Sequence, residues 1–360
     1  MRILHTESSL GWGGQEIRVL SESQGLARRG HEIRLLCPPQ ARIFTEAPNW
    51  GLQPEAVPIA RKSWTGFSAL KKKMQEKPCD VVSTHSSTDS WLSALALRSL
   101  GRPYPMVRTR HISAPVPRNP LSRWLYTRAT TRIVTAGEAL KNELVERNGF
   151  PGERIDSVPT GIDTQRFKPG DKLTARERLG LPKEKLLVGI VATLRSWKGH
   201  RYLLEALPGE AGLVIVGDGP QRPMLEAQVT KLKVRYKVLF AGNQQDVVPW
   251  LQSFDVFAQP SYANEGVPQA LIQAMLAGLP CVTTNIGSMA ELAIDRKTAL
   301  VVAPEDVPSL RAALGKLLQD RALAEQLGAA ARKHCAERFG YETMLDRMER
   351  IYSEVADAHR

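Results

Sequence analysis

The sequence predicts an α/β protein with two domains, each built on a parallel β-sheet that helices cover on both faces. Three observations support this prediction. The chain has 360 residues, enough for two or three ordinary domains. Short apolar runs typical of buried strands alternate with segments of helical periodicity. The alternation stops in a polar stretch with Pro and Gly after "SVPTGID" (157–163) and starts again at "LLVGIVATL" (186–194).

The first half begins with a strand in "RILHT" (2–6), a loop in "ESSLGWGGQ" (7–15) and a helix over 16–28. Further strands are expected in "GHEIRLLCP" (30–38), "DVVSTH" (80–85), "MVRTRH" (106–111) and "RIVTAG" (132–137). We therefore expect a Rossmann-like domain over residues 1–165 and a linker over residues 166–185.

The second half repeats the alternation. After 186–194, strands are expected in "GLVIVGDGP" (212–220), "KVLFAGN" (237–243), "VFAQPS" (256–261) and "PCVTTN" (280–285). The chain from about Val307 has helical character with a break near Gly340. These patterns predict a second Rossmann-like domain over residues 186–340, a cleft between the domains and a terminal helix over residues 341–360.

Composition and charge limit the class of protein. No run approaches the ~20 apolar residues of a membrane-spanning helix, and the first residues lack the apolar stretch of a signal peptide. The four cysteines are far apart and lack metal-ligand spacing, so reduced thiols and a cytoplasmic location are expected.

Of the net charge of +12, most lies in residues 1–150, which hold 22 Lys and Arg against 12 Asp and Glu. Such a surface suits nucleic acid, an anionic membrane or an anionic substrate, but neither zinc-finger spacing nor an aromatic RNA-binding signature occurs.

The stretch "NEGVPQALIQAM" (264–275) places an acid, Glu265, just before a helix and an amide, Gln273, inside it. Pro268 suits the first helical turn, and Gly278 ends the helix. Because the stretch follows a strand, Glu265 lies where open α/β sheets bind ligands, beside N–H groups that favour anions and hydroxyl oxygens. A simple helix cap is the alternative role for Glu265.

Two further strand-end loops are candidates for binding phosphate. "GWGGQE" (11–16) is a glycine-rich turn without the dinucleotide-binding spacing, and a tight structural turn is the alternative. In "LRSWKGH" (194–200), Arg195 and Lys198 could hold a diphosphate, and solvated surface charge is the alternative. The strand-end turn "VGDGP" (216–220) is weaker evidence.

Taken in order, "GWGGQE", "RTRH", "PTGIDTQRF", "LRSWKG", "VGDGP", "FAGN" and "PSYANEGVPQALIQAMLAGLPCVTTNIGSMAEL" resemble glycosyltransferase family 4 over roughly residues 1–340. These are the retaining "group 1" transferases with the GT-B fold. The resemblance implies two Rossmann-like domains, a nucleotide sugar bound mainly by the second, and a final helix that returns to the first.

The resemblance also assigns roles to residues. Glu265, Lys198 and His111 match the catalytic positions: the acid on the donor sugar, the lysine on the diphosphate and the first-domain histidine near the transferred sugar. The donor-binding positions are Gly13, Gly14, Thr193, Arg195, Gly217, Phe240, Ala241, Gly266, Val267 and Gln273. Candidates on the acceptor side are His85, Arg110 and Trp12, and a strand-end structural role for His85 stays open.

Several positions depart from the family pattern. The second acid of the E-x7-E pair, a ribose ligand, is Gln273, which can still bond two hydroxyls but without charge. The position of the diphosphate arginine is Thr193, and Arg195 is a possible replacement. Pro268 stands where glycine is common, and Thr160 stands in place of the asparagine in "NGVD". These departures affect individual donor contacts rather than the core of the site.

The expected reaction needs neither a metal nor another cofactor. No D-x-D motif occurs, so charge on the departing diphosphate would be met by Lys198, Arg195, glycine amides and helix ends. The resemblance implies sugar transfer with retention, and we favour a UDP-sugar as donor. The rival functions are a nucleotide-sugar 2-epimerase of the same architecture and a basic nucleic-acid-binding protein.

Two basic segments indicate which kind of acceptor the protein uses. "ARKSWTGFSALKKKMQEK" (60–77) and "RNPLSRWLYTR" (118–128) mix Lys and Arg with aromatic side chains, as membrane-surface segments do, although ordinary solvated helices share this composition. We expect a glycan acceptor that is lipid-linked or part of lipopolysaccharide, reached at the inner face of the cytoplasmic membrane. No nucleic acid is expected as a partner.

Overall fold

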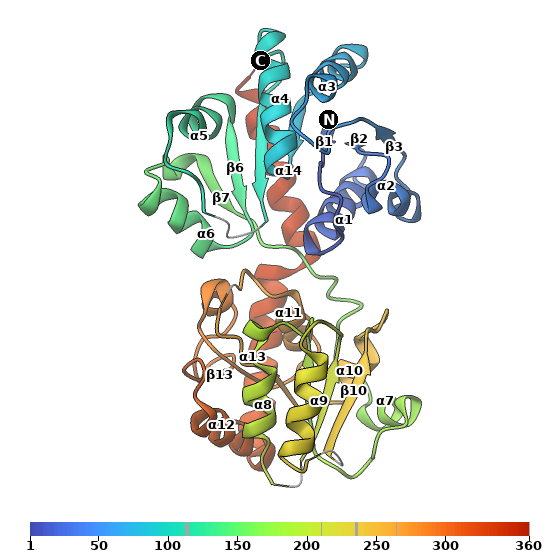
Figure 1. Ribbon diagram of the computed structural model, residues 1–360, viewed down its shortest axis with the longest axis vertical. Coiled ribbons are helices and arrows are strands. Elements are labelled where there is room, and N and C mark those ends of the chain that lie inside the picture. Colours follow the sequence, from blue (N-terminus) through green and yellow to red (C-terminus); the bar gives the residue numbers. More distant parts are fainter. Residues whose placement is uncertain (112–114, 210, 235–236, 264, 360) are drawn as a thin grey trace. The chain divides into compact units, whose positions relative to one another are not determined.

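The computed structural model describes residues 1–111, 115–209, 211–234, 237–263 and 265–359. It divides into two compact units (Figure 1). The first unit comprises Met1–Gly161 and Glu342–Arg360, and the second comprises Ile162–Tyr341. Each unit contains a parallel sheet with helices, so the predicted fold class, two doubly wound α/β domains, is confirmed.

The sheet of the first unit has, among the described residues, seven strands in the order β3-β2-β1-β4-β5-β6-β7, all parallel where they pair. The order reverses between β1 and β4, which are neighbours in the sheet but not in sequence. The strands are β1 (Arg2–Thr6), β2 (Glu32–Cys37), β3 (Pro54–Ala56), β4 (Val81–Thr84), β5 (Met106–Arg110), β6 (Arg132–Thr135) and β7 (Ile155–Ser157).

Helices connect the strands of the first unit. Ser86 and Asp89 form a capping box at the start of the helix that follows β4, and Asn119 caps the helix that follows β5. The helices are α1 (Gly14–Arg28), α2 (Arg42–Glu46), α3 (Trp64–Glu76), α4 (Ser87–Ser99), α5 (Pro120–Trp124) and α6 (Glu138–Asn142), with short helical turns η1 (Ala47–Trp50), η2 (Leu125–Ala129), η3 (Glu143–Arg147) and η4 (Gly152–Arg154).

The sheet of the second unit has six strands among the described residues, in the order β10-β9-β8-β11-β12-β13. Its order reverses between β8 and β11, and these neighbouring strands again pair in parallel. The strands are β8 (Leu187–Val191), β9 (Gly212–Val216), β10 (Val238–Gly242), β11 (Val256–Gln259), β12 (Cys281–Thr283) and β13 (Leu300–Val301).

Helices also cover this second sheet. They are α7 (Lys172–Leu179), α8 (His200–Ala206), α9 (Arg222–Lys231), α10 (Val248–Ser253), α11 (Gln269–Leu276), α12 (Val307–Gln319) and α13 (Arg321–Phe339), with the turns η5 (Ser196–Lys198) and η7 (Gly287–Glu291). The segment 166–185, expected as a linker, contains α7, which packs with α10 in the second unit.

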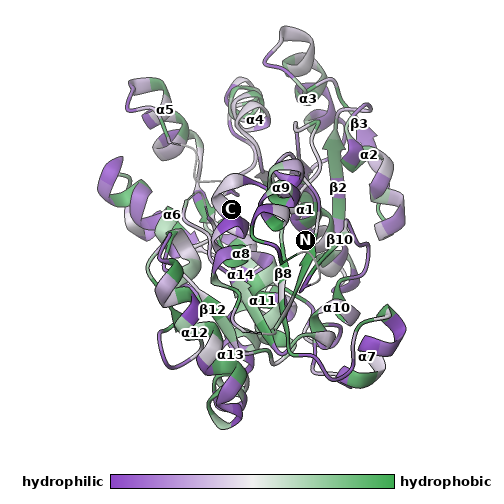
Figure 2. Cartoon of the chain, turned by 60° about the horizontal axis from the view of Figure 1, so that its bottom comes forward, coloured by the Kyte–Doolittle hydropathy of each residue, from purple (hydrophilic) through white to green (hydrophobic). Residues whose placement is uncertain are grey.

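Apolar side chains of the strands form the cores. Leu4, Leu36 and Val82 are buried in the first unit, and Val188, Ile190 and Val256 are buried in the second. Coloured by hydropathy, β2 and β8 are largely hydrophobic, whereas α2 and α7 carry hydrophilic stretches (Figure 2). All four cysteines are free and buried. Burial raises the pKa of Cys37 to about 12, so its thiol stays protonated and unreactive.

The last helix, α14 (Tyr341–Asp357), belongs from Glu342 onward to the first unit. Its Tyr352 is fully buried there, where the hydroxyl donates to Glu22 at 2.8 Å and lies 2.9 Å from Ser83 Oγ. Near the start of α14, Arg29 of the first unit pairs with Glu342, Asp346 and Glu349. The first unit is therefore assembled from both ends of the chain.

Candidate functional site

Strand order locates one candidate site in each unit. Open parallel sheets bind ligands beyond the carboxyl ends of the strands, at the point where the strand order reverses. In the second unit this point lies between β8 and β11, and in the first unit between β1 and β4. The loops that follow these four strands contain most of the polar residues singled out in the sequence.

In the second unit, the loops after β8 and β11 are joined by an ion pair. Lys198 Nζ donates to Glu265 Oε1 at 2.7 Å and to Oε2 at 3.0 Å. The Glu265 side chain is only 4% exposed and that of Lys198 is 19% exposed. The sequence indicated both residues but did not indicate that they contact each other.

Neighbouring residues fix the position of Glu265. Ser261 Oγ donates to Glu265 Oε1 at 2.6 Å, and Thr284 Oγ1 in turn donates to the Ser261 carbonyl at 2.6 Å. Gly287 has φ +57°, and a Cβ there would lie 2.0 Å from the Glu265 carbonyl oxygen. The backbone around Glu265 therefore depends on a glycine at 287.

Glycine is also required beside Lys198. Gly199 has φ +77°, and a Cβ at this position would lie 2.0 Å from the Pro260 carbonyl oxygen. The loops after β8 and β11 thus pass each other in close backbone contact, which brings Lys198 to Glu265. His200 follows at the start of α8, where burial and the nearby Lys198 lower its pKa to about 4.

The other donor-side residues of the second unit lie near the carboxyl ends of neighbouring strands. Thr193 and Arg195 follow β8, and the Arg195 guanidinium lies 5.8 Å from the centre of the Trp197 ring. Gly217 follows β9, and its N–H donates to the Gly242 carbonyl at 2.8 Å. Phe240 and Ala241 lie in β10, where Arg222 covers the Phe240 ring at 5.7 Å.

Gly266 and Val267 stand between Glu265 and α11, and Gly266 is exposed. Pro268 precedes the first helical residue, Gln269, and the helix ends before Gly278 at φ +78°. Gln273 lies partly exposed in the middle of α11. As the sequence predicts, Glu265 lies just before a helix and Gln273 lies inside that helix.

In the first unit, the loop after β1 meets the start of α4. Glu7 accepts hydrogen bonds from Ser86 Oγ and, at 2.7 Å, from Gln15 Nε2. Gly13 and Gly14 lie at the start of α1, on the same loop. Trp12 stacks instead on Arg42 at 4.9 Å and packs against the cluster that includes Val19 and Ile43.

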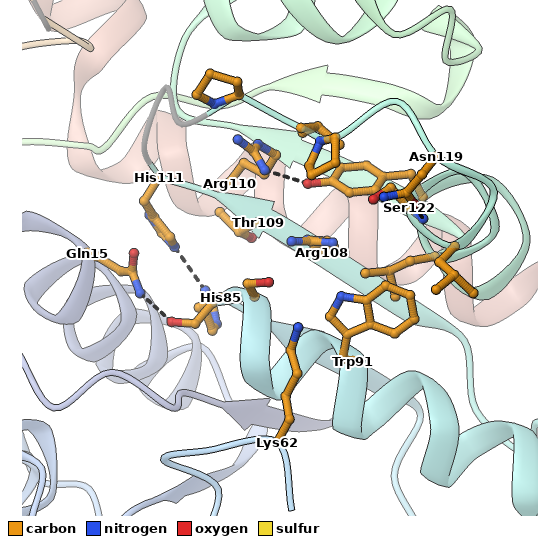
Figure 3. A pocket seen from close by; sticks show the side chains of 18 residues that line it. Gln15, Lys62, His85, Trp91, Arg108, Thr109, Arg110, His111, Asn119 and Ser122 are labelled. Atoms are coloured by element: carbon orange, nitrogen blue, oxygen red, sulfur yellow. Dashed lines mark hydrogen bonds between the residues drawn. The ribbon is translucent and has the colours of Figure 1, made fainter.

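Three histidines of the first unit form a hydrogen-bonded row. His5 Nδ1 lies 2.9 Å from His85 Nε2, and His85 Nδ1 lies 3.2 Å from His111 Nε2 (Figure 3 shows the second contact). His5 and His85 are buried in the structure. Burial, reinforced by Arg18 and Arg110, lowers the pKa of His111 to about 3, and burial also lowers the pKa of His85 well below its usual value. At neutral pH these rings are uncharged and act as hydrogen-bond donors and acceptors.

A pocket with a volume of about 630 Å³ opens beside this row (Figure 3). His85 and His111 lie on its wall together with Arg110, and the remaining polar and aromatic residues include Lys62, Trp91, Arg108, Asn119 and Tyr126. The Arg110 guanidinium donates to the Tyr126 hydroxyl. Of the three acceptor-side candidates, the structure brings His85 and Arg110 together here, whereas Trp12 is not among the lining residues.

Several residues of these sites were not singled out from the sequence. Ser261 is too common a residue type to attract attention, although it follows a strand. Arg108 gave a clearer signal, because a charged residue inside the apolar strand "MVRTRH" needs a reason for its burial. Tyr352 gave none, since its partners Ser83 and Glu22 are about 270 and 330 positions away in sequence.

The neutral histidine row leads to a prediction about pH. We expect the imidazoles of His85 and His111 to stay unprotonated in the folded protein from pH 8 to pH 5, because burial holds both pKa values low. In the unfolded chain they take up protons near pH 6.5. The unfolded state therefore binds more protons below that pH, and the histidines lower the stability as pH falls from about 6.5 towards 3, by up to about 1.4 kcal/mol per pH unit and proton.

NMR of the imidazole carbons during a pH titration checks this prediction, with the urea-unfolded chain as the reference. Glu7 and Asp89 act in the opposite direction, since burial raises the pKa of both carboxyl groups, so total stability alone does not isolate the histidines. A titration midpoint above pH 6 for His111 in the folded protein would contradict the prediction.

The two doubly wound domains, each with a polar site at its switch point, match the GT-B fold of glycosyltransferases. The sequence models of this class match nearly the whole chain. "Glycosyltransferase Family 4" matches residues 12–166, and "Glycosyl transferases group 1" matches residues 171–334. The chain belongs to glycosyltransferase family 4, the group 1 glycosyltransferases, and is an enzyme of that class.

Named relatives agree with this assignment. The D-inositol 3-phosphate glycosyltransferase of Xylanimonas cellulosilytica is 28% identical over 389 residues, covering 95% of this chain and 92% of the relative. UDP-Gal:alpha-D-GlcNAc-diphosphoundecaprenol alpha-1,3-galactosyltransferase of Escherichia coli is 26% identical over 380 residues, covering 99% and 97%.

Among solved structures, HepE from Anabaena in complex with UDP superposes with a TM-score of 0.88 at 20% identity, covering 98% of this chain and 100% of that one. The same protein in complex with UDP-glucose gives a TM-score of 0.83. At this identity the likeness establishes the shared fold.

Proposed function

We propose that the protein transfers a sugar, with retention of its anomeric configuration, from a UDP-sugar to a lipid-linked or envelope-glycan acceptor. The observation that carries the donor half of this proposal is the Lys198–Glu265 pair at the switch point of the second unit. Family membership supplies the reaction class, and the UDP and UDP-glucose bound to HepE support the choice of nucleotide.

Lys198 is suited to hold the donor diphosphate. A lysine ammonium has three N–H donors, and two of them point to Glu265 in this structure. One donor is left for a phosphate oxygen, and the side chain is 19% exposed, so it can be reached. Glu265 keeps the ammonium in one place before the donor binds, which is how a preorganised charge stabilises a leaving group.

Glu265 is assigned to the sugar of the donor, and Gln273 is assigned to its ribose. Glu265, fixed by Ser261 and Lys198, has acceptor capacity left for hydroxyl groups of the sugar. Gln273 lies one turn and a half along α11, where an amide can bond the two ribose hydroxyls. Gly266 is an exposed residue, and its backbone N–H and that of Val267 are suited to complete the donor contacts.

The first unit contributes neutral polar groups. His111 is uncharged at neutral pH, so it can orient a hydroxyl or the transferred sugar without repelling a cationic transition state. Gly13 and Gly14, at the amino end of α1, offer backbone N–H groups to an anion. We propose that the reaction proceeds without a metal, because lysine, arginine and backbone amides can meet the charge of the diphosphate.

A thermal-shift screen tests the donor proposal. UDP and UDP-sugars are expected to stabilise the protein by RT ln(1+[L]/Kd), about 2.7 kcal/mol at a hundredfold excess over Kd, in a buffer containing EDTA. GDP- and ADP-sugars serve as the comparison. Absence of a shift with every nucleotide would overturn the proposal, and a shift only with GDP or ADP would overturn the choice of UDP.

For the acceptor, both relatives' names contain a phosphorylated compound, an inositol phosphate in one and a diphosphoundecaprenol in the other. None of the described helices is long and apolar enough to cross a membrane. An acceptor carried by a lipid would be met at a membrane surface. We propose that the two basic segments of the first unit, 60–77 and 118–128, bind this membrane surface.

The structure brings these segments close to one another. Lys62 lies over Trp91 of α4 at 5.4 Å, and Trp91 stacks on Trp124 of α5 at 5.9 Å. Accordingly, α4 lies between α3 and α5 (Figures 1 and 2). Two apolar side chains stand out from this region, Trp64 with 79% exposure and Leu121 with 67% exposure. Exposed apolar tips among basic residues are typical of proteins that bind membrane surfaces.

We predict that the protein binds anionic vesicles and that the binding weakens as salt rises. The double variant Trp64→Ser/Leu121→Ser should bind roughly tenfold or more weakly, because both side chains would lose their burial in the interface. Leu173→Ser, at a leucine of the second unit that is 52% exposed, is the control. Vesicle co-sedimentation measures the effect. Equal binding to neutral and anionic vesicles, or none to either, would exclude this surface.

A further inference from the structure

The pocket of the first unit has an unusual balance of charge. Lys62, Arg108 and Arg110 line it together with the neutral rings of His85 and His111, and no Asp or Glu occurs among its lining residues within the described chain. Its walls all come from the first unit. The donor site proposed above lies in the second unit, so this pocket is a different feature.

Arg108 is the residue that demands an explanation. Its side chain comes from β5 and the residue is only 5% exposed, yet its Nη1 has no hydrogen-bond partner among the described atoms. Its close contact is the face of the Tyr126 ring, 4.3 Å from the guanidinium carbon. A buried guanidinium costs much free energy when its N–H groups are not bonded, so such a group at a pocket wall indicates an anion that enters the pocket.

Among the described residues Arg108 has no carboxyl group within ion-pair distance, although Asp89 attracts it from farther away. Asp89 accepts hydrogen bonds from Thr6 Oγ1 at 3.0 Å, from His85 N at 2.9 Å and from Ser86 N at 2.8 Å. Burial, with Glu7 nearby, raises the pKa of Asp89, which weakens its attraction for Arg108. The Nη1 group of Arg108 therefore remains to be bonded by a ligand.

We infer that this pocket binds a phosphate group carried by the sugar acceptor, with Arg108 at its base and Lys62 at its rim. The inference rests on the proposed transferase function and narrows its acceptor to a phosphorylated compound. A guanidinium fork is suited to bind phosphate oxygens through paired N–H groups, and the Lys62 ammonium adds a point charge. Asn119 uses its side-chain oxygen to accept from Ser122 N at 2.8 Å, which leaves its NH₂ group to donate.

The rest of the lining suits what the phosphate is attached to. Trp91 offers aromatic surface to a sugar or cyclitol ring, and Leu121 and Pro117 offer apolar contact to a lipid chain. A volume of about 630 Å³ accommodates a phosphate together with one such ring or the start of a chain. A phosphate monoester on a ring and a lipid diphosphate share the chemistry that Arg108 requires.

Calorimetric titration of the full chain tests the inference. Saturating UDP is present throughout, so that a phosphate probe cannot bind at the donor site. The probes are myo-inositol 3-phosphate and geranyl diphosphate, and the uncharged counterparts are myo-inositol and geraniol. At least one phosphate probe should bind, and its uncharged counterpart should bind at least tenfold more weakly. Which probe binds more tightly tells a ring phosphate from a lipid diphosphate.

Variants then locate the binding. Arg108→Gln and Lys62→Gln should each weaken the phosphate probe by about 10- to 100-fold, the usual effect of losing a hydrogen bond to a charged group. Lys72→Gln makes the same change of charge on α3, where the Lys72 side chain is 79% exposed, and should leave the affinity unchanged. Because Arg108 is buried and its variant can fail to fold, exposed Lys62 provides the deciding measurement.

Three results would overturn the inference: neither phosphate probe binds, the uncharged counterparts bind equally well, or Lys62→Gln binds as the unchanged protein does. A loss of equal size in Lys72→Gln would overturn it as well, since it would indicate non-specific charge attraction. These results are distinguishable from failure of the proposed function, which would appear as absence of UDP binding before any phosphate probe is added.

Discussion

Replacing Lys198 with alanine is expected to lower turnover by on the order of 10²- to 10³-fold, while the protein still folds. The ammonium is the charged group that Glu265 holds at the switch point of the second unit, with one N–H left for the leaving diphosphate. Without it, Glu265 keeps only the bond from Ser261, and the loss of its partner should cost about 1–3 kcal/mol of stability. Initial rates at saturating donor, measured well below the melting temperature, check this result.

Lys183→Ala is a matched control for this experiment. Lys183 also pairs with a glutamate of the second unit, Glu177, at 3.2 Å, but its side chain is 50% exposed. We expect normal turnover in this variant, since exposed ion pairs contribute little. If Lys198→Ala retained near-normal turnover, Lys198 would have no part in the reaction.

The second large effect is expected at Glu265, and the contrast with Gln273 makes it informative. Glu265→Gln keeps the shape and can still accept from Ser261 and Lys198, but it removes the charge that orders the sugar hydroxyls. We expect kcat to fall by on the order of 10²-fold or more, because these hydroxyls must be held while the glycosidic bond breaks. Gln273→Glu, on α11, should mainly change KM, because the ribose is bound equally in the ground and transition states.

Steady-state kinetics with varied donor separate the two roles. Tighter donor binding in Gln273→Glu would agree with the charged ribose ligand that stands at this position in the family pattern. If Glu265→Gln kept full kcat while Gln273→Glu abolished it, the two assignments would have to be exchanged.

The parts of the fold that could be predicted are those with strong local patterns. β8 and β9 have continuous apolar sequences, and the end of α11 is marked by Gly278, so their places follow from the chain itself. The strands β3, β7 and β13 were missed, because two or three residues at the outer part of a sheet carry little periodicity. The helix α7 was hidden in a polar stretch of weak amphipathic character.

The residues of the candidate sites could be predicted from the sequence, but the contacts between them could not. Glu265 and Lys198 stood out because each follows a predicted strand, yet 67 residues separate them and nothing local requires their pairing. The same holds for His85 and His111, whose contact depends on the order of β4 and β5 in the sheet. The sequence could not predict that Arg108 Nη1 lacks a hydrogen-bond partner, because this depends on which residues the neighbouring carboxyl groups contact in the folded protein.

The assembly of the first unit from both chain ends has a consequence for folding during synthesis. The segment Ile162–Tyr341 is continuous, so it can complete its core as soon as it leaves the ribosome. The earlier-made residues cannot, because the hydroxyl between Ser83 and Glu22 belongs to Tyr352, which is synthesised after the whole second unit. Until α14 leaves the ribosome, the position of the Tyr352 side chain beside the buried charges of Arg18 and Glu22 stays empty. The unit whose synthesis starts first is therefore completed after the second unit, and ribosome stalling before α14 is made would leave it exposed to chaperones and proteases.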